Sequence, residues 1–557
     1  MEIRQLSDEI AVSPQITAKD VAAIAKAGYR AIICNRPDGE APDQPSANAI
    51  ARAAKKAGLA FRDLPVDKGI VTDANAGDMK TALMELPGPV LAYCRTGTRS
   101  ATAWSLAVAD TRPLPEILEA ASAAGYDMSG VARRIVNGGK TPTETGDAKY
   151  DVVIVGGGAA GIAVASSLHS RRPDISIAVI DPAGTHYYQP GWTMVGAGIF
   201  EASTTAKTMG GLIPRDVHWI KTGVAAFEPD NNAVLLDGCR VVKYKRLVVC
   251  PGLKLDWGAI EGLEETLGSN GVTSNYRFDL APYTWELVRR LHRGRAVFTQ
   301  PPMPIKCPGA PQKAMYLSAD HWRKGNVLPG MDIQFMTSLN TLFGIKDYVP
   351  ALQSYVDLYG IDVNYTTTLK AVDGAAQKAW FDKVDAAGNV ERIETSFDML
   401  HVAPPQTAPD VIRVSPLADA GGWVDVDQAT LRHRQYENIW ALGDVANTPN
   451  SKTAAAARAQ APVVAENMAD DMMGKSPTAV YNGYGSCPLT VERGKIVLAE
   501  FGYGGVLMPT FPKWMIDGTK PSRMAWVLKE QILPPVYWKA MLRGKEWLAK
   551  PEKISAG

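Results

Sequence analysis

The stretch Asp151–Gly161 reads DVVIVGGGAAG, and it decides the fold of most of the chain. Its apolar run predicts a buried parallel strand, and its glycines open the helix that follows. A second strand, predicted over 175–180, ends in Asp181, close to the spacing at which an acidic residue binds ribose in dinucleotide sites. Strand, glycine loop, helix and acid together predict a dinucleotide-binding α/β fold.

The residues of this loop have separate tasks in such a fold. Gly156 allows the tight turn, Gly158 lets the backbone approach a pyrophosphate, and Gly161 lets the helix pack closely on the strand. Asp181 would bind a ribose hydroxyl. The predicted dinucleotide-binding residues of this segment are Gly156, Gly158, Ala159, Ala160, Gly161 and Asp181.

A second motif indicates which dinucleotide is bound. Residues 438–444 read NIWALGD, a predicted strand followed by Gly443 and Asp444. In flavoproteins with two dinucleotide-binding folds, such a Gly-Asp pair meets the ribityl and phosphate part of FAD. The strand 247–249, followed by Pro251 and Gly252, resembles the mid-chain crossing segment of those proteins. The resemblance implies FAD as the cofactor.

The segment after the predicted strand 295–300 argues against a second nucleotide. Residues 301–311 read PPMPIKCPGAP, with five prolines and Cys307 where a nicotinamide-binding flavoprotein carries glycines. Proline has no N–H group to offer a phosphate. The sequence therefore predicts a thiol site in place of an NAD(P)H site, and a sulfur compound as electron donor.

Composition excludes several classes of protein. The 557 residues are 46% hydrophobic and 21% charged, which is typical of a folded globular chain. The net charge of +1 lacks the excess of basic residues that is typical of nucleic-acid-binding proteins. The seven histidines are too scattered along the sequence to predict a metal site. Six cysteines are too few for a disulfide-stapled secreted scaffold, and the acidic first residues do not suit a targeting peptide. We therefore expect a reducing, cytoplasmic compartment and no membrane-spanning segment.

The chain is expected to divide into four parts. A polar, glycine-rich and proline-containing seam over 138–148 predicts a linker between an N-terminal domain, 1–137, and an oxidoreductase region, 149–520. Residues 521–557 form a separate tail. In the N-terminal domain, alternating signals predict helices and parallel strands: helices 22–27, 47–56 and 100–109, and strands 31–34 and 90–93.

The N-terminal domain carries a thiol loop. Residues 94–100 read CRTGTRS between a strand and a helix, so backbone N–H groups and Arg99 can surround an anion beside Cys94. Such a cradle favours a thiolate. Four residues separate Cys94 from Arg99, whereas protein tyrosine phosphatases keep five, and rhodanese-type sulfurtransferases use the tighter loop. A phosphatase would also need a general acid; Asp67 or Asp38 could serve, but neither lies in a recognisable motif.

This loop, with residues 35–40 (NRPDGE), resembles a bacterial family over about residues 1–137. Its members have a dual-specificity-phosphatase-like fold, are often regarded as sulfurtransferases, and occur fused to persulfide-handling enzymes. The resemblance implies a sulfurtransferase role for Cys94 and Arg99. A phosphatase that regulates a partner and a non-enzymatic docking module remain open alternatives.

Two further cysteines lie far apart in the sequence. Cys307 and Cys487 both sit in loops with glycine and proline, whereas Cys239 and Cys250 occupy positions expected in strands. The residues alone leave open that Cys307 and Cys487 are unrelated structural thiols. The region from about 150 to 543, however, resembles the mitochondrial-type sulfide:quinone oxidoreductases. The matching segments are 186–196 (HYYQPGWTMVG), 422–427 (GWVDVD), 451–456 (SKTAAA) and the two cysteine loops.

The resemblance implies a redox-active disulfide between Cys307 and Cys487 beside FAD. Hydrogen sulfide would open it, Cys307 would pass electrons to the flavin, and Cys487 would carry the sulfane sulfur. A quinone then reoxidises the flavin, and a small thiol or sulfite takes the sulfur, with the Cys94 domain receiving it or processing the product. Further cofactor contacts implied by the matching segments are Gln189, Lys452 and Thr453, the last opening a helix. The alternative is a type II NADH:quinone dehydrogenase with an N-terminal phosphatase. The proline-rich loop argues against it, because that loop lacks the glycines of a nicotinamide-binding site.

The tail is aromatic and basic. Predicted helices over 524–533 and 536–548 are separated by Pro534 and Pro535, and lysines and arginines alternate with Trp, Met and Leu. This pattern is typical of a helix that lies in a membrane surface, which predicts peripheral binding to the cytoplasmic face of the inner membrane. A dimer contact, or packing on the protein core, is the alternative.

Overall fold

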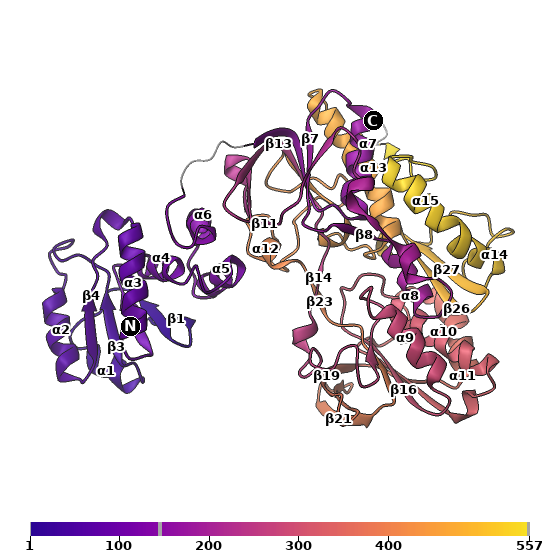
Figure 1. Ribbon diagram of the computed structural model, residues 1–557, viewed down its shortest axis with the longest axis horizontal. Helices are drawn as coiled ribbons and strands as arrows, with labels where there is room; N and C mark the ends of the chain where they lie inside the picture. Colours follow the sequence, from indigo (N-terminus) through magenta and orange to yellow (C-terminus); the bar gives the residue numbers. More distant parts are fainter. Residues whose placement is uncertain (1, 143–147, 554–557) are drawn as a thin grey trace. The chain divides into compact units, whose positions relative to one another are not determined.

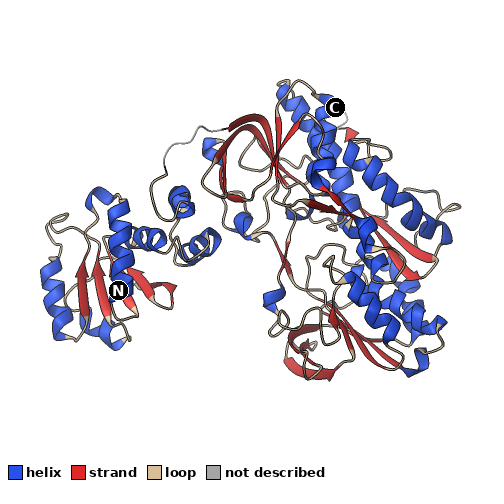
Figure 2. Ribbon diagram, in the orientation of Figure 1, coloured by secondary structure: helices blue, strands red, loops and turns tan. Residues whose placement is uncertain are grey.

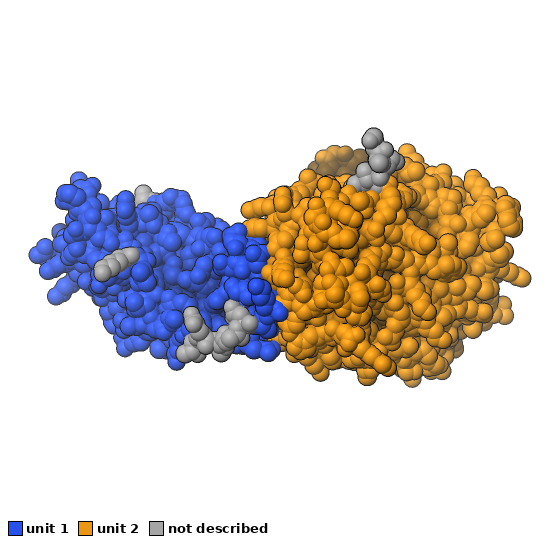
Figure 3. Space-filling model, turned by 90° about the horizontal axis from the view of Figure 1, so that it is seen from above, with its two compact units in different colours: residues 1–149, 223–243, 410–416 blue, residues 150–222, 244–409, 417–557 orange. Residues whose placement is uncertain are grey.

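A computed structural model describes residues 2–142 and 148–553 of the chain. It contains two compact units, shown in different colours in Figure 3. Unit 1 comprises residues 1–149, 223–243 and 410–416, and unit 2 comprises the rest. Part of the predicted linker, 143–147, lies outside the described residues. The domain boundaries stay predictions.

Unit 1 is built on a five-stranded sheet. Along the sheet the strands run β1 (Arg4–Ser7), β2 (Ile10–Ser13), β5 (Val90–Tyr93), β3 (Ala31–Cys34) and β4 (Ala60–Asp63). Only the β1–β2 pair is antiparallel. Every residue of β2, β3 and β5 is buried, as expected for parallel strands covered on both faces. The structure confirms the predicted strands 31–34 and 90–93.

Helices cover both faces of this sheet (Figure 1). On one face, Ile24 and Ile50 pack with Ile32 and Leu91 of the strands. On the other, Trp104 lies in a cluster with strand residues such as Ala92. The first face carries α1 (Val21–Lys26) and α2 (Ala47–Lys56); the helices of the second cluster are α3 (Asp73–Glu85), α4 (Thr98–Ala107), α5 (Leu114–Ala123) and α6 (Ala132–Val136).

Unit 1 also contains a hairpin of β11 (Val224–Glu228) and β12 (Ala233–Leu236). Cys239 follows β12 in a turn, with a φ of 69°. The prediction that Cys239 lies in a strand is therefore wrong, because the chain reverses direction at Gly238 and Cys239. Cys34, at the end of β3, is buried as expected of a strand residue.

The first sheet of unit 2 is the predicted dinucleotide fold. β6 (Ala148–Val155) pairs in parallel with β7 (Ile177–Ile180), which pairs with β10 (Val217–Ile220); β13 (Val241–Val249) pairs in parallel with β24 (Ile439–Ala441). The helix predicted after the glycine loop is α7 (Ala159–Arg171). It packs beside α13 (Ala454–Met472), as Figure 2 shows. Both helices share a core cluster with the buried side chains of β6.

A second parallel sheet lies in the middle third of the chain. Its order is β15 (Val272–Thr273), β22 (Met399–His401), β16 (Gly294–Gln300), β17 (Met331–Thr337) and β18 (Asp362–Asn364). The proline-rich segment leads from β16 into α10 (Ala310–Lys324), which packs against the hairpin of β26 (Gly485–Glu492) and β27 (Lys495–Phe501). This packing joins the two cysteine loops, because one precedes α10 and the other lies in β26.

Smaller elements complete unit 2. An antiparallel sheet consists of β19 (Thr367–Asp373), β20 (Lys378–Val384) and β21 (Val390–Ser396). The remaining helices and strands are α8 (Trp192–Val195), α9 (Ala281–Arg290), α11 (Val349–Tyr359), β8 (Thr185–Tyr187), β9 (Ala206–Thr208), β14 (Lys254–Leu255), β23 (Gln406–Thr407), β25 (Ala479–Val480) and β28 (Glu552–Lys553). A short helix, α12 (Asp410–Arg413), falls in unit 1.

The tail forms one helical run instead of the two helices predicted. α14 (Arg523–Val527) passes through a π-helical turn (Leu528–Ile532) directly into α15 (Leu533–Lys539). The prediction failed because Pro534 and Pro535 do not interrupt the run: they occupy the first turn of α15, where an N–H is not required. The wider π turn before them accommodates the missing donors and the proline rings.

This run packs on the core of unit 2. Tyr537, Trp538, Met541 and Leu542 are buried in the same cluster as α7 and α13. The Ser166 hydroxyl of α7 donates to the carbonyl of Leu542 at 2.9 Å. Packing on the core, the alternative left open by the sequence, therefore describes this face of the tail. In the described part of the chain no helix combines the length and apolarity needed to cross a membrane.

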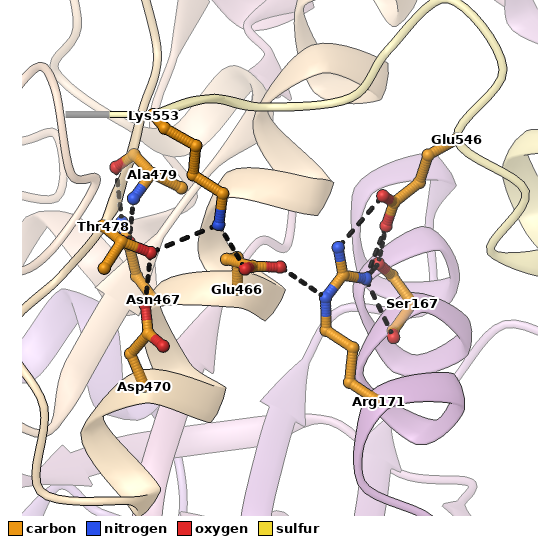
Figure 4. A network of polar contacts seen from close by, with 9 residues as sticks. All are labelled: Ser167, Arg171, Glu466, Asn467, Asp470, Thr478, Ala479, Glu546 and Lys553. Atoms are coloured by element: carbon orange, nitrogen blue, oxygen red, sulfur yellow. Dashed lines mark hydrogen bonds and ion pairs between the residues drawn. The ribbon is translucent and has the colours of Figure 1, made fainter. Parts of the chain in front are cut away.

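A polar network fixes the end of the tail (Figure 4). Arg171 of α7 bonds to Glu466 of α13 at 2.9 Å and to Glu546 of the tail at 2.5 and 3.0 Å. Lys553 bonds in turn to Glu466 and to Thr478. Because three segments share these bonds and the buried aromatic face, removal of the tail would expose core surface. Its role is better tested by substitutions on its exposed face.

Candidate active site

A cavity of about 490 Å³ lies within unit 2. Its wall is built from segments that are far apart in the sequence: the glycine loop, the segment after β7, the Cys307 loop, the start of α13, the β26–β27 hairpin and the tail. Among the predicted site residues, those on the wall are Gly156, Gly158, Ala159, Ala160, Asp181, Gln189, Gly252, Cys307, Gly443, Asp444, Lys452 and Thr453.

The glycine loop has the close contacts that require glycine. Gly156 has a φ of 105°, and a Cβ there would lie 2.4 Å from the Cys250 carbonyl oxygen. A Cβ on Gly161 would lie 1.8 Å from the oxygen of Gly156. At Gly158, on the wall, no atom lies within 4 Å of the Cβ position. The backbone of Gly158 is thus open to a ligand, next to the N-terminus of α7.

Asp181 and Gly443 also organise backbone at the cavity. The Asp181 carboxylate accepts from the N–H of Gly157 at 2.6 Å and from that of Ala183 at 2.7 Å. Gly443 has a φ of 76°, and its N–H donates to the Gln460 side chain at 2.8 Å. Both residues therefore shape the loops between which a dinucleotide would lie.

Unpaired polar atoms show that the cavity suits a polar ligand. The Trp192 Nε1, the Thr193 Oγ1 and both amide atoms of Asn275 are buried and have no hydrogen-bond partner among the described residues. All three side chains line the cavity. Buried polar groups are normally paired, so a ligand with hydrogen-bonding groups is needed here.

Cys307 and Cys487 meet at this wall, with their sulfur atoms 3.9 Å apart. This is the contact distance of two thiols, longer than the roughly 2.05 Å of a disulfide bond. Cys307 has a φ of 47° and donates its N–H to the Lys452 carbonyl at 2.8 Å. Cys307 lines the cavity, whereas Cys487 is fully buried in the core behind it.

Gly309 makes this approach possible. A Cβ on Gly309 would lie 2.6 Å from the Cys487 sulfur and 2.4 Å from the Leu489 side chain. Such distances are shorter than any real Cβ contact, so a side chain at this position would push α10 and β26 apart. The sequence analysis missed this residue, since nothing in the segment KCPGAP indicates a neighbour in β26.

Two buried lysines set the charge of the thiol pair. The Lys313 ammonium donates to the Cys307 sulfur at 3.1 Å. The hydrogen bond from the Cys487 thiol and the Lys313 charge hold the pKa of Cys307 well below its usual range, and the shared proton together with burial raises the pKa of Cys487. The charge of Lys529, in the tail, also lowers the pKa of Cys307. Burial, and then the charge of Lys313, lower the pKa of Lys529 itself to about 7. The reduced pair is therefore a Cys307 thiolate beside a Cys487 thiol.

Lys313 lies six residues after Cys307, a spacing that gives no signal in the sequence, and Lys529 belongs to the basic and aromatic pattern that predicts a membrane-surface helix. Both are functional residues that sequence reasoning missed. Lys529 is 3% exposed and donates to the Pro190 carbonyl at 2.8 Å. Only the fold brings the tail to the thiols.

The predicted cofactor contacts Gln189 and Lys452 have protein partners. Lys306 donates to the Gln189 side chain at 2.8 Å. Lys452 donates to the carbonyls of Asp444 and Ala446 at 2.7 and 2.8 Å. Burial lowers the pKa of Lys452 to about 8. Thr453 caps α13 by accepting from the Ala456 N–H at 3.1 Å, so its side chain fixes the helix start at the cavity.

The Cys94 loop in unit 1 provides one backbone donor to the cysteine sulfur. Cys94 is buried at the end of β5, and its sulfur accepts from the Gly97 N–H at 3.1 Å. Gly97, with a φ of 91°, turns the chain into α4.

Arg99 is held by a carboxylate that the sequence analysis did not consider. Its two terminal nitrogens each donate to Glu40 at 2.8 Å, and Nη1 also donates to the Val66 carbonyl at 3.1 Å. Arg36 donates to the same carboxylate at 3.0 Å. Glu40 thus orients Arg99 and balances part of its charge. Asp38, considered as a general acid, accepts from the Ala47 N–H at the start of α2.

Comparison with known proteins separates the two parts of the chain. Residues 2–111 match the family model of the beta-lactamase hydrolase-like protein, phosphatase-like domain. The beta-lactamase hydrolase-like protein of Xylella fastidiosa is 36% identical over 130 residues, 23% of this chain and 30% of that protein. The mitochondrial sulfide:quinone oxidoreductase of Mus musculus is 40% identical over 395 residues, 71% of this chain and 87% of that protein.

A solved structure shows the same fold in unit 2. The sulfide:quinone oxidoreductase of Aquifex aeolicus superposes with a TM-score of 0.60 at 20% identity, over 73% of this chain and 97% of that one. The comparisons confirm the predicted resemblance of both regions and the predicted fold: a phosphatase-like domain followed by a flavoprotein with two dinucleotide-binding folds.

Substitution of Lys313 tests the origin of the Cys307 thiolate. In the reduced protein, Lys313→Met removes the ammonium at the Cys307 sulfur, so we expect the pKa of Cys307 to rise. The measurement is the pH dependence of Cys307 alkylation by iodoacetamide, read by peptide mass spectrometry. Lys324→Met, which removes a lysine paired with Asp320 on the same helix, is the control. An unchanged alkylation profile in Lys313→Met would show that Lys313 does not stabilise the thiolate.

Proposed function

The chain belongs to the sulfide:quinone oxidoreductase family, and from this membership we propose that it oxidises hydrogen sulfide through the Cys307–Cys487 pair with a quinone as electron acceptor. The single observation that carries the proposal is the meeting of the two sulfurs, 3.9 Å apart, at the wall of the polar cavity. The proline-rich loop in place of a second glycine loop disfavours an NADH dehydrogenase.

FAD is the cofactor of this family, and the cavity fits it. The phosphates would lie at Gly156 and Gly158, next to the α7 N-terminus, while Gly161 allows the close packing of α7. Asp181 would meet the ribose, and Gly443 and Asp444 the ribityl part. Trp192, Thr193 and Asn275 supply the polar atoms that otherwise have no partner. When bound, FAD supplies a two-electron acceptor beside the thiols.

The charges of the pair determine the sulfur chemistry. Hydrosulfide attacks the Cys487 sulfur of the disulfide, the S–S bond breaks, and the products are a Cys487 persulfide and a Cys307 thiolate. Lys313 stabilises the leaving thiolate, and Cys307 faces the cavity where the electrons must go. A small thiol or sulfite removes the outer sulfur from Cys487. Re-forming the disulfide then releases two electrons, which reach the quinone.

The exposed face of the tail fits a membrane surface. Within the tail Met524, Val527, Ile532, Trp547 and Leu548 are exposed, and Trp514, which lies just before the tail, is 82% exposed. Ile532 and Leu548, with Leu528, line the cavity as well, so apolar surface continues from the protein exterior to the site. We infer peripheral binding to the inner membrane by this face, with quinone entering from the lipid.

For unit 1 we propose sulfur transfer. A sulfur atom held by Cys94 needs a thiolate cradle and one oriented cation, which Gly97 and Arg99 supply. Glu40 accepts three bonds from the two arginines, which leaves less positive charge than a phosphate dianion requires. The sulfane sulfur from Cys487, carried by a small thiol, is the proposed substrate.

Anaerobic mixing with sulfide tests the main reaction. We expect sulfide to bleach the flavin of the native protein and Cys307→Ser to slow bleaching by about 100-fold or more, because a serine cannot form the disulfide. Stopped-flow absorbance measures the rate, and Cys239→Ser, in the turn of unit 1, is the matched control. Bleaching of Cys307→Ser at the native rate, or bleaching by NADH, would contradict the proposal.

Vesicle binding tests the membrane face. Replacing Trp514 and Trp547 by Ser removes two exposed indoles, and we expect co-sedimentation with anionic vesicles to weaken by about tenfold or more, given the free energy of burying aromatic surface. Val384→Ser with Val390→Ser, which changes exposed apolar residues on β20 and β21, serves as control. Equal sedimentation of both double variants and the native protein would exclude this face as the anchor.

Trapping of a persulfide tests unit 1. After turnover with sulfide, quinone and glutathione, we expect mass spectrometry to find one added sulfur on Cys94, and Cys94→Ser to lose the transfer of that sulfur to cyanide. Phosphotyrosine hydrolysis by the native protein would favour the phosphatase alternative. A Cys94→Ser variant that transfers sulfur normally would leave only a docking role.

A further inference from the structure

A buried carboxylate, that of Glu500, lies on the cavity wall and has no ion-pair partner among the described residues. Glu500 of β27 is 5% exposed. It pairs across the hairpin with Ser486, which is the residue before Cys487. Both Glu500 and Ser486 line the cavity. No ion pair to Glu500 occurs within residues 2–142 and 148–553. An isolated buried carboxylate is costly, and such groups are found where chemistry requires them.

Hydroxyl and amide groups hold this carboxylate in place. The Tyr484 hydroxyl donates to Oε1 at 2.7 Å, and the Thr510 N–H donates to Oε2 at 3.1 Å. The Thr510 hydroxyl also donates to Oε1 and lies 3.1 Å from the Tyr484 oxygen. Glu500, Tyr484 and Thr510 thus form a closed triad, which we call the Glu500 triad.

The Glu500 triad connects solvent with the cavity. Thr510 is an exposed residue, whereas Tyr484 is half-buried and Glu500 is buried, and all three line the cavity. A proton can therefore pass along existing hydrogen bonds from the protein surface to the wall. The wall near the triad also carries Phe511 and Leu528, which are suited to an apolar ring such as a quinone.

The proposed reaction needs such a path. Transfer of sulfur from hydrosulfide to a thiolate releases two electrons and one proton, while a quinone takes up two electrons and two protons to become a quinol. At least one proton per turnover must therefore reach the quinone in the cavity from solvent. The lysines near the thiols do not meet this need: Lys313 is bound to the Cys307 sulfur and Lys529 to the Pro190 carbonyl, and both are buried.

We propose that the Glu500 triad is the proton path for quinone reduction, an inference that rests on the proposed function. Tyr484 gives its hydroxyl proton to a quinone oxygen as two electrons arrive. Glu500, which has first taken a proton from solvent at Thr510, passes that proton to Tyr484 in the same movement and becomes a carboxylate again. Burial raises the pKa of Tyr484, so a free tyrosinate is unfavourable and the two transfers are coupled.

Separate measurement of the oxidative half-reaction tests the triad. The full chain with bound flavin is reduced with dithionite and mixed with a water-soluble ubiquinone analogue in H₂O and in D₂O. We expect Glu500→Gln and Tyr484→Phe to slow reoxidation by about 100-fold, in the range of lost general-acid catalysis, and to change its pH profile and solvent isotope effect. Thr510→Val, at an exposed position, should slow it less, with the same change in isotope effect.

Glu492→Gln is the matched control, because Glu492 lies in β26 and pairs with Lys495 away from the cavity wall. Native reoxidation rates and isotope effects in both Glu500→Gln and Thr510→Val would overturn the proposal. If Glu500→Gln fails to fold, native reoxidation rates and isotope effects in Thr510→Val and Tyr484→Phe would overturn the proposal. Since dithionite replaces sulfide, a failure of sulfide to bleach the flavin would overturn the proposed function while leaving this test intact.

Discussion

The close approach of Gly309 to Cys487 is the constraint on which the site of unit 2 depends. The loop before α10 can pass β26 at thiol contact distance only because position 309 has no side chain. The same approach places Cys307 at the cavity wall and Cys487 behind it in the core. The order of the two sulfurs relative to the cavity is therefore a packing property, and the different roles of the two thiols follow from it.

Burial amplifies the electrostatics of this pair. The two sulfurs share one proton, and the Lys313 ammonium donates to the Cys307 sulfur at 3.1 Å. In a medium of low dielectric constant, this asymmetry is enough to make Cys307 the stable thiolate and Cys487 the stable thiol. Lys529 strengthens the asymmetry from the tail, which explains why a segment that looks like a peripheral appendage is packed into the core.

The sequence predicted what local pattern determines. Strands 31–34 and 90–93, the glycine loop and its helix, and the thiol loop all depend on neighbouring residues, and the structure has them as expected. The pairing of Cys307 with Cys487 came from resemblance alone. Glu40, Lys313 and Lys529 were missed because each acts on a partner in another segment. The prediction of two separate tail helices was wrong because two prolines normally end a helix. The π turn that keeps this helix continuous has no signature in the sequence.

The cavity must serve three species with conflicting needs. Hydrosulfide and thiolates need cations, a quinone needs apolar surface, and a proton needs a polar chain to solvent. The wall separates these functions: lysines surround the thiols, tail side chains form the apolar part, and Tyr484, Glu500 and Thr510 form the polar chain on the β26–β27 hairpin. Because Glu500 and Cys487 lie on paired strands of that hairpin, one small element positions both the proposed sulfur carrier and the proposed proton path.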